Sequence, residues 1–370
     1  MNKKIIFIST SRADYNLIKG LYNIIKLPKS YIKKLIVTGT SVSKKYGYNK
    51  TEFSHIKKIF VNLNSSSELM LPRIISNYFT KFYFLLKKQN PNYLILLGDR
   101  YETLVLAFTA KVLGIKILHF HGGEKSFGSM DNEWRNIISN LSDYHFVSHS
   151  SYKKNLLKIG IKSNNIYNVG AVGAYLLEKY KSKKLKIANN YKKKIIVTFH
   201  PATKNLKKSR EEFNEMINSI TNLNNMYFCI TYPGHDSDSD NIIKKLDKLK
   251  RNYKNIDVIK KVSINSFYNY LKNFDLFMGN SSSGIIESAS ANIPFLNIGI
   301  RQKGRLKSKN VFDVNGKSNL ITKSIISILK LKKKKYKNIY LNKNFEKKIN
   351  QIINTKLLWN ILKKAKYQNV

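Results

Sequence analysis

Short apolar runs alternate with longer amphipathic segments along nearly the whole chain, and this alternation is the strongest constraint on its fold. Runs such as KIIFIS and YLILL are apolar at consecutive positions, and the segments between them carry apolar residues at helical spacing. Strands that are apolar throughout are typical of parallel sheets covered by helices on both faces. The pattern therefore predicts a doubly wound α/β fold.

The candidate strands fall into two groups separated by a polar, lysine-rich stretch. They span residues 4–10, 34–39, 59–63, 93–99, 116–123, 144–149 and 166–170, and then 194–200, 226–232, 256–262, 275–280 and 294–299. A chain of 370 residues exceeds the usual size of one hydrophobic core. We expect two Rossmann-like domains that face a central cleft, at 1–178 and 194–345. Residues 179–193 would link them, and a C-terminal helix at 346–370 would pack back on the first domain.

The net charge of +45 raises the possibility of a nucleic-acid-binding protein. The lysines are scattered, however, and the joint enrichment in Lys, Asn and Ile is what AT-rich codon usage produces. We therefore expect no specific nucleic-acid partner. Arginine occupies only eight positions. In a chain so rich in lysine, each arginine indicates a site that needs a planar, bidentate donor. Five lie in motif-like stretches: Arg12, Arg100, Arg135, Arg301 and Arg305.

The single cysteine, Cys229, excludes an internal disulfide and fits a reducing cytoplasm. No apolar run reaches the ~18 residues that a membrane span needs, so we expect no membrane insertion. The apolar run at 4–10 is interpreted as a first strand and not as a signal peptide. A cytoplasmic location follows from these observations.

Functional residues of parallel sheets gather where strands end. Arg12 follows the first strand in TSRADY, at the expected start of a helix. A cation at a helix N-terminus is favourable only if an anion binds there, so Arg12 indicates an anion site. The alternative is that this stretch only caps the helix. Asp99 and Arg100 follow the fourth strand directly, as candidate functional residues or as a structural ion pair with each other.

The stretch HFHGGEKSFGSMDNEWRN gathers more chemistry than any other. Glu124 and Asp131 flank one loop, and two acids in one cleft can differ in pKa, so that one accepts a proton while the other donates. His119 and His121 raise the alternative of a metal site with Glu124. Both histidines fall on one face of the expected strand and can simply pack there, so we expect no metal.

The second half adds an acid–base candidate and an anion cradle. His200 ends the first strand of that half, in TFHP. The GNSSSG motif opens a helix, and its backbone amides and hydroxyls form a cradle for anions. The cradle comprises Ser281, Ser282, Ser283 and Gly284. Glu287 lies one turn further, within reach of ribose hydroxyls. Arg301, Lys303 and Arg305 follow beside the cradle as anion-binding residues or as part of a solvated basic loop. The acidic loop 232–240 is expected to be mostly solvated.

These motifs resemble, in order and spacing, those of hydrolysing UDP-N-acetylglucosamine 2-epimerases from Lys3 to about Val314. They are TSRADY, GDRYE, HGGE, TFHP, GNSSSGIIE and NIGIRQKGR. The resemblance implies the GT-B fold, a homodimer or homotetramer, a UDP-sugar substrate and no metal or other cofactor. It also implies conversion of UDP-N-acetylglucosamine and water to N-acetylmannosamine and UDP, through a glycal, for sialic acid synthesis. Residues GDR and HGGE are less similar to the non-hydrolysing epimerases.

The resemblance assigns roles to individual residues. It implies Asp99, Glu124 and Asp131 as the acid–base set, with His200 near the leaving phosphate or the glycal. The substrate-binding residues that it implies are Arg12, Arg100, Arg135, Ser281, Ser282, Ser283, Gly284, Glu287, Arg301 and Lys303.

The chain departs from the family pattern at a few positions: Trp134, Asn136, Val172 and Tyr175. A changed sugar pocket is the simplest consequence, which makes UDP-2,4-diacetamido-2,4,6-trideoxyglucose of legionaminic acid synthesis a second candidate substrate. Two other classes stay open at this point. One is a GT-B glycosyltransferase, which would need an acceptor, and the other is a basic, non-catalytic nucleic-acid-binding protein.

Overall fold

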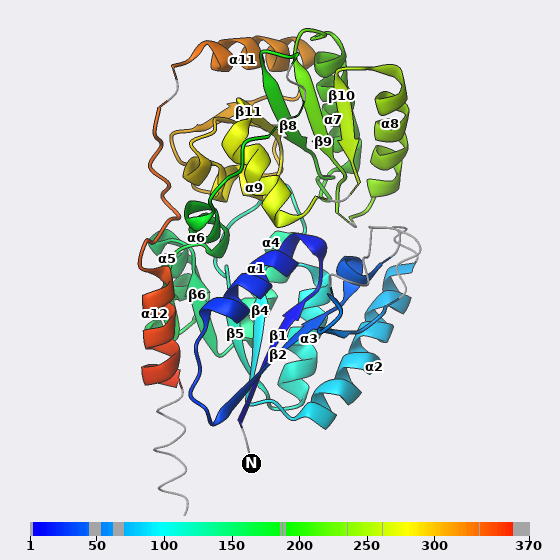
Figure 1. The fold of residues 1–370 in the computed structure, drawn as a ribbon. Coiled ribbons are helices and arrows are strands. Elements are labelled where there is room, and N and C mark those ends of the chain that lie inside the picture. Colours follow the sequence, from blue (N-terminus) through cyan, green and yellow to red (C-terminus); the bar gives the residue numbers. More distant parts are fainter. Residues whose placement is uncertain are drawn as a thin grey trace, which may run out of the picture.

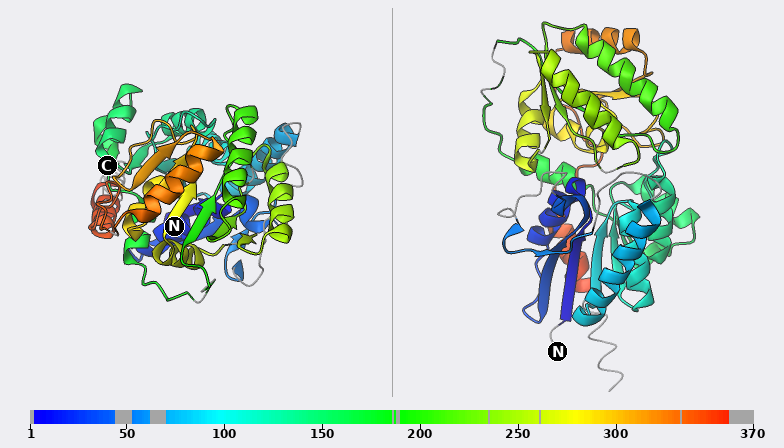
Figure 2. Two further views of the ribbon diagram at one scale, coloured as in Figure 1. Left: turned by 90° about the horizontal axis from the view of Figure 1, so that it is seen from above. Right: turned by 90° about the vertical axis from the view of Figure 1, so that its right-hand side faces the viewer.

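Two parallel β-sheets, each covered by helices, form two lobes stacked end to end (Figures 1 and 2). A computed structural model of the chain describes residues 3–43, 53–61, 70–185, 187, 190–234, 236–260, 262–332 and 334–357. Every strand pairing in both sheets is parallel. The doubly wound α/β fold predicted from the alternation of runs is confirmed.

The first lobe is built on a sheet with the order β3-β2-β1-β4-β5-β6-β7. Its strands are β1 (Lys3–Ser9), β2 (Tyr31–Val37), β3 (Lys57–Lys58), β4 (Tyr93–Leu97), β5 (Lys116–Phe120), β6 (Tyr144–Val147) and β7 (Ile166–Asn168). Its helices are α1 (Arg12–Ile24), α2 (Leu71–Gln89), α3 (Tyr101–Val112), α4 (Asp131–Leu141), α5 (Ser150–Lys158) and α6 (Val172–Lys179).

The second lobe has the sheet order β10-β9-β8-β11-β12-β13. Its strands are β8 (Lys194–Thr198), β9 (Tyr227–Thr231), β10 (Ile256–Ile259), β11 (Leu276–Gly279), β12 (Phe295–Ile298) and β13 (Val311–Val314). Its helices are α7 (Leu206–Thr221), α8 (Ser239–Asn252), α9 (Ile264–Asn273), α10 (Ser282–Ile286) and α11 (Ser318–Lys330).

Alternate residues of one strand feed two separate cores, which explains why the strands are apolar throughout. In β1, Ile5 and Phe7 pack with α1, whereas Ile6 and Ile8 pack on the opposite face with α2 and α3. Burial of both faces leaves the ends of the strands as the place for polar side chains. The strand order reverses between β1 and β4 and between β8 and β11, and these are the switch points where ligands bind.

The chain crosses between the lobes twice. It first passes from α6 to β8 through the expected linker, of which residues 186, 188 and 189 lie outside the described part. After α11 it returns along the first lobe and forms α12 (Phe345–Gln351), shown in red in Figure 1. Phe345 and Ile349 belong to the same buried cluster as Ile5. Of the C-terminal helix expected at 346–370, residues 358–370 lie outside the described part.

Several element boundaries differ from those expected. Most strands end earlier, and β5 ends at Phe120, so His121 lies beyond the strand in a left-handed conformation with φ of 67°. The third strand is shorter and earlier than 59–63, of which 62 and 63 lie outside the described residues. The edge strand β13 was not predicted, because it is brief and only partly buried. No helix in the described ranges is long and apolar enough to cross a membrane.

Candidate active site

A cavity of about 310 Å³ lies between the two lobes, at the carboxyl ends of their central strands. Both lobes line it, and most of the residues predicted from the sequence meet there. These are Arg12, Asp99, Arg100, Glu124, Asp131, His200, Ser281, Ser282, Ser283, Glu287 and Arg301. Residues far apart in the chain therefore share one site because strand ends converge.

Three predicted residues are not among those that line the cavity. Arg135 is 1% exposed and lies beneath it, where it donates to the carbonyl of Glu124 at 2.7 Å and pairs with Asp99. Gly284 packs so closely on the ring of Phe295 that any larger side chain would collide with it. The side chain of Lys303 is exposed, and its position is set by its carbonyl, which accepts a hydrogen bond from a backbone amide of the β5–α4 loop.

Two of the three acid–base candidates are held as carboxylates by arginines. Glu124 accepts hydrogen bonds from His121 Nδ1 (2.9 Å) and Ser148 Oγ (2.7 Å), and its second oxygen pairs with Arg305. Burial alone would raise the pKa of Glu124, but Arg305 and His121 together lower it well below its usual value. Asp99 follows the same logic: burial opposes ionisation, while Arg135 and Arg305 lower its pKa.

The third candidate, Asp131, has a raised pKa instead of a lowered one. It is the first residue of α4, and its carboxylate lies 3.8 Å from the Arg301 guanidinium of the other lobe. Burial and the negative charge of Asp99 raise the pKa of Asp131, and Arg301 only partly offsets them. The cavity therefore contains carboxyls of unlike proton affinity, as general acid–base chemistry requires.

His200 presents a neutral N–H donor to the cavity. The Gly234 amide donates to Nδ1 at 3.2 Å, so Nδ1 carries the lone pair and Nε2 carries the proton. Burial, followed by the charge of Arg301, lowers the pKa of His200 to about 4. The backbone of His200 is fixed by Asn280, whose side-chain amide accepts from its N–H (2.7 Å) and donates to its carbonyl (2.8 Å).

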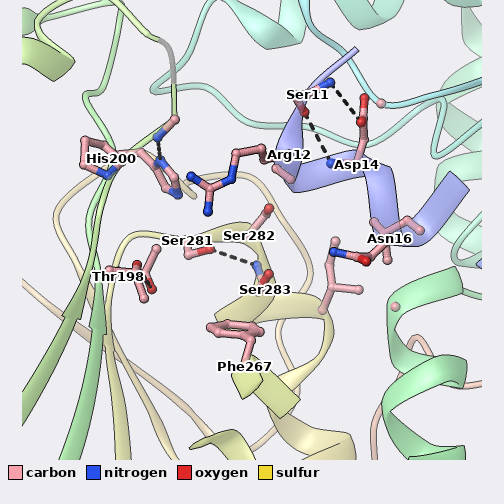
Figure 3. Close-up of a pocket in the computed structure, with 18 of the residues that line it drawn as sticks. Ser11, Arg12, Asp14, Asn16, Thr198, His200, Phe267, Ser281, Ser282 and Ser283 are labelled. Atoms are coloured by element: carbon pink, nitrogen blue, oxygen red, sulfur yellow. Dashed lines mark hydrogen bonds between the residues drawn. The ribbon is translucent and has the colours of Figure 1, made fainter. Parts of the chain in front are cut away.

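The remaining wall is suited to an anion. Figure 3 shows the Arg12 guanidinium extending from α1 towards His200 and the three serines at the start of α10, Ser281–Ser283. Arg12 also donates to the carbonyl of Lys260 in the other lobe at 3.1 Å. Ser281 caps α10 by accepting from the amide of Ser283 at 3.3 Å. Donors from both lobes thus converge on one part of the cavity.

Glu287 closes the far side of this wall. It is 6% exposed and lies directly against Gly173 of α6, where a larger side chain would collide with it. Burial raises the pKa of Glu287 to about 7, although a hydrogen bond from Ser283 opposes the shift.

Sequence reasoning missed several residues of the site. Arg305 lines the cavity and pairs with Glu124, whereas the sequence placed it beside the anion cradle or in a solvated basic loop and gave it no carboxylate partner. The loop 232–240 is not simply solvated, because Asp236 lines the cavity and accepts a hydrogen bond from Arg100 at 3.0 Å. Arg100 therefore pairs across the lobes and with Glu102, not with Asp99. His235, in the same loop, lies outside the described residues.

No metal site stands out in the described part of the chain, where no group of three or more His, Cys, Asp or Glu side chains could hold an ion. His119 is buried in β5 and approaches the Gly98 carbonyl with Nε2 at 2.8 Å. Cys229 is buried in β9, where burial raises the pKa of its thiol to about 12.

Comparison with known proteins agrees with this geometry. A family model described as UDP-N-acetylglucosamine 2-epimerase matches residues 26–354. A UDP-N,N'-diacetylbacillosamine 2-epimerase (hydrolyzing) of Legionella pneumophila is 30% identical over 366 residues, which cover 96% of each chain. A GDP/UDP-N,N'-diacetylbacillosamine 2-epimerase (hydrolyzing) of Campylobacter jejuni is 30% identical over 323 residues, 84% of each chain.

A solved structure supports the architecture. The Methanocaldococcus jannaschii UDP-GlcNAc 2-epimerase, in complex with UDP-GlcNAc and UDP, superposes with a TM-score of 0.75 at 20% identity, over 95% of this chain and 99% of that one. The likeness confirms the expected arrangement of two Rossmann-like domains. Together with the family match over most of the chain, it leads to one assignment: the chain belongs to the UDP-N-acetylglucosamine 2-epimerase family.

Proposed function

We propose that the chain is a hydrolysing 2-epimerase, which converts a UDP-linked 2-acetamido sugar and water into the free 2-epimeric sugar and UDP. One observation carries the proposal: a single cavity combines carboxyls of unlike proton affinity with a wall of cationic and hydroxyl donors. The first group suits proton exchange at C2, and the second suits a diphosphate that leaves from C1.

The reaction needs two steps that balance as follows. A base removes the C2 proton, the C2–H electrons form the C1=C2 bond of a glycal, and the C1–O bond breaks with its electron pair on UDP. Water then adds through oxygen to C1, and a proton is delivered to C2 from the opposite face. One proton of that water replaces the proton that the acid delivered to C2, and the C2 proton held by the base passes to UDP or solvent, so both enzyme groups are restored.

The described side chains divide these tasks. Arg12 and the Nε2–H of His200 would stabilise the charge that develops on the departing phosphate. Asp131 would carry a proton that is exchanged at C2, because its raised pKa favours the protonated form. Asp99 and Glu124 would act as carboxylates, since their arginine partners favour ionisation.

The names of the relatives support UDP-N,N'-diacetylbacillosamine, a UDP-2,4-diacetamido-2,4,6-trideoxyglucose, as the substrate. Two enzymes named for it are each 30% identical over most of this chain. UDP-N-acetylglucosamine, which the sequence motifs placed first, is the second candidate; it is the sugar bound in the solved structure, at 20% identity. The choice decides whether the product would enter legionaminic or sialic acid synthesis.

We also propose that the enzyme acts in the cytoplasm as a homodimer or homotetramer. The outer faces of α2 and α3 expose large apolar side chains, with Phe84 65% and Phe108 52% exposed. A second copy covering these rings would remove them from water. Light scattering after gel filtration would show a single subunit mass if the proposal is wrong.

The decisive experiment follows both candidate sugars by proton NMR in D2O, in parallel tubes with the purified protein. Release of UDP together with a free manno-configured sugar carrying deuterium at C2 is the expected result, and the faster tube identifies the substrate. Release of UDP without exchange at C2 would reduce the protein to a simple hydrolase. If both UDP-sugars survived, turnover on adding an acceptor would indicate a glycosyltransferase, and salt-dependent DNA binding without turnover a nucleic-acid-binding protein.

A further inference from the structure

A closed ring of hydrogen bonds surrounds the residue next to Arg305. The amide of Leu306 donates to Tyr152 Oη (3.2 Å), and Tyr340 Oη donates to the Leu306 carbonyl (2.7 Å). The two phenol oxygens lie 2.7 Å apart. Tyr340 has one proton, which goes to Leu306, so Tyr152 must donate to Tyr340. Each donor of the ring then has an acceptor.

The ring joins three parts of the molecule that are far apart in sequence. Tyr152 lies in α5 of the first lobe, Tyr340 in the segment that returns from the second lobe, and Leu306 in the loop after β12. The two tyrosines are 2% and 0% exposed, and their rings stack with centroids 6.2 Å apart. The carbonyl of Tyr340 also accepts from the amide of Ala171 at 2.8 Å, directly before α6. These contacts hold the hydroxyls at fixed positions.

The residue before Leu306 depends on such positioning. The Arg305 side chain is only 6% exposed, pairs with Glu124, and has Nη2 3.9 Å from Asp99. A buried guanidinium is stable only while its acidic partners stay in contact. Because both backbone polar groups of Leu306 are fixed by the ring, the Cα of Arg305 cannot shift away from the carboxylates without breaking a hydrogen bond.

We propose that Tyr152 and Tyr340 are positioning residues, which act through Leu306 to hold Arg305 in ion-pairing reach of Glu124 and Asp99. The catalytic consequence rests on the proposed function, whereas the positioning itself does not. Neither tyrosine is among the residues that line the cavity, so their effect on the chemistry is indirect.

Other charged groups that face Glu124 and Asp99 limit how far the pKa values of these carboxylates change when Arg305 is displaced. Asp99 also faces Arg135, Asp131 and Glu124, and Glu124 also faces His121 and Arg135. These neighbours stay in place when a tyrosine hydroxyl is removed. Loosening Arg305 should therefore raise the pKa values of the two carboxylates without releasing them from all cationic partners.

The test uses Tyr152→Phe and Tyr340→Phe, which keep the stacked rings and remove one hydroxyl each. Tyr227→Phe is the matched control, because its hydroxyl also donates a hydrogen bond, to the carboxylate of Asp257 at 2.7 Å, but away from the cavity. We expect kcat to fall about fivefold in each ring variant. The acid limb of the kcat/KM profile should move up by about 0.5 pH unit. KM should stay unchanged, and the control should match the wild type.

A uniform loss of kcat at every pH, or unchanged profiles in both ring variants, would overturn the proposal. An activity-independent arm separates it from the proposed function. Urea unfolding measures the free energy of unfolding of Tyr340→Phe, Arg305→Gln and the double variant. The double variant should lose less unfolding free energy than the sum of the losses in the two single variants. Additive losses would contradict positioning through Arg305. If the wild type released no UDP from either sugar, the proposed function would be wrong. The unfolding comparison of the three variants would still test the positioning role, because it needs no activity.

Discussion

Four of the acidic side chains that line the cavity have different neighbours, which give them different affinities for protons. Asp99 and Glu124 face arginines, Asp131 faces the charge of Asp99, and Glu287 is buried beside a glycine. The same functional group can thus stabilise charge, exchange a proton or bind a hydroxyl, depending on the elements packed against it.

Replacement of Asp131 by Asn should nearly abolish turnover. The amide cannot exchange the proton, so we expect the rate of UDP release to fall about 10²–10⁴-fold. Affinity for UDP, measured by calorimetry, should be unchanged, because the anion-binding wall is intact. Glu133→Gln is the matched control: Glu133 lies two residues on, is 42% exposed and pairs with Lys204. Wild-type turnover in Asp131→Asn would remove this residue from the catalytic set.

Replacement of Glu287 by Gln should change how stability depends on pH. Burial raises the folded-state pKa of Glu287 to about 7, above its unfolded value, so its stabilising contribution is present below about pH 4.5 and is lost as pH rises through 7. The wild type should therefore lose roughly 2 kcal/mol of unfolding free energy between pH 5 and pH 8 that the variant keeps. Urea unfolding at both pH values tests this, and an equal change in the two proteins would contradict it.

The same carboxylate should couple nucleotide binding to pH. If ionised Glu287 accepts hydrogen bonds from ribose, uridine should bind more tightly at pH 8 than at pH 6. Glu287→Gln should bind weakly at both pH values, as measured by calorimetry with uridine, which has no phosphate to titrate. A variant that binds uridine like the wild type and loses only kcat would refute the ribose role.

Strand-end residues could be predicted from sequence, whereas their partners could not. Asp99 and His200 were found because each directly follows an apolar run, and parallel strands bring such positions together. Arg305 and Asp236 lie in loops whose composition suggests solvent exposure. Their role depends on contacts with Glu124 and Arg100 of the opposite lobe, and no local pattern encodes a contact across 136 or more positions.

At the scale of elements, the β5–α4 loop and the loop after β12 pack against each other across the lobes. A Cβ on Gly128 would lie 2.5 Å from the Cα of Arg301, and the Phe127 amide donates to the Lys303 carbonyl at 2.9 Å. This contact fixes the distance between Asp131 on one loop and Arg301 on the other.

Gly128→Ala should therefore impair catalysis more than folding. Backbone of the opposing loop must move, at about 1–3 kcal/mol, and Arg301 should shift away from Asp131. We expect a lower kcat/KM with a modest loss in thermal midpoint. Gly20→Ala is the control, because its new methyl group would meet only the mobile end of the Leu176 side chain and helix propensity favours alanine. Equal kcat/KM in both variants would contradict the interlocking.

Periodicity predicted the existence of most elements but not their ends. The apolar run at 116–123 predicts one strand. The strand ends at Phe120, because the chain turns through residues with positive φ, His121 and Gly123. Glycine signals such a turn, whereas histidine does not. The edge strand β13 could not be predicted, because its residues are only partly buried and so lack a continuous apolar run.

At the scale of the whole molecule, the returning segment completes the first lobe. Phe345, Ile349 and Ile353 pack in the cluster that contains Ile5 and Leu21. The ring of Phe345 also stacks on that of Tyr175 of α6, with centroids 5.1 Å apart.

Phe345→Ala should destabilise the first lobe strongly. A buried ring lost from a packed core lowers the unfolding free energy by about 3–5 kcal/mol. Phe84→Ala, which removes a ring that is 65% exposed, should change it by less than about 0.5 kcal/mol. Urea unfolding compares the two, and similar midpoints would show that α12 contributes little to the first lobe.

This arrangement orders the folding of the two lobes during synthesis. On one face of the second sheet, the core uses residues from Ile195 to Ile328, an uninterrupted stretch, so it can close as soon as that stretch leaves the ribosome. The core on the other face also needs Tyr340. The first lobe begins earlier but stays open along one side until Phe345–Ile353 emerge. We therefore expect the half of the protein that is translated first to finish folding last, with the apolar side chains that Phe345–Ile353 cover exposed until translation has passed Ile353.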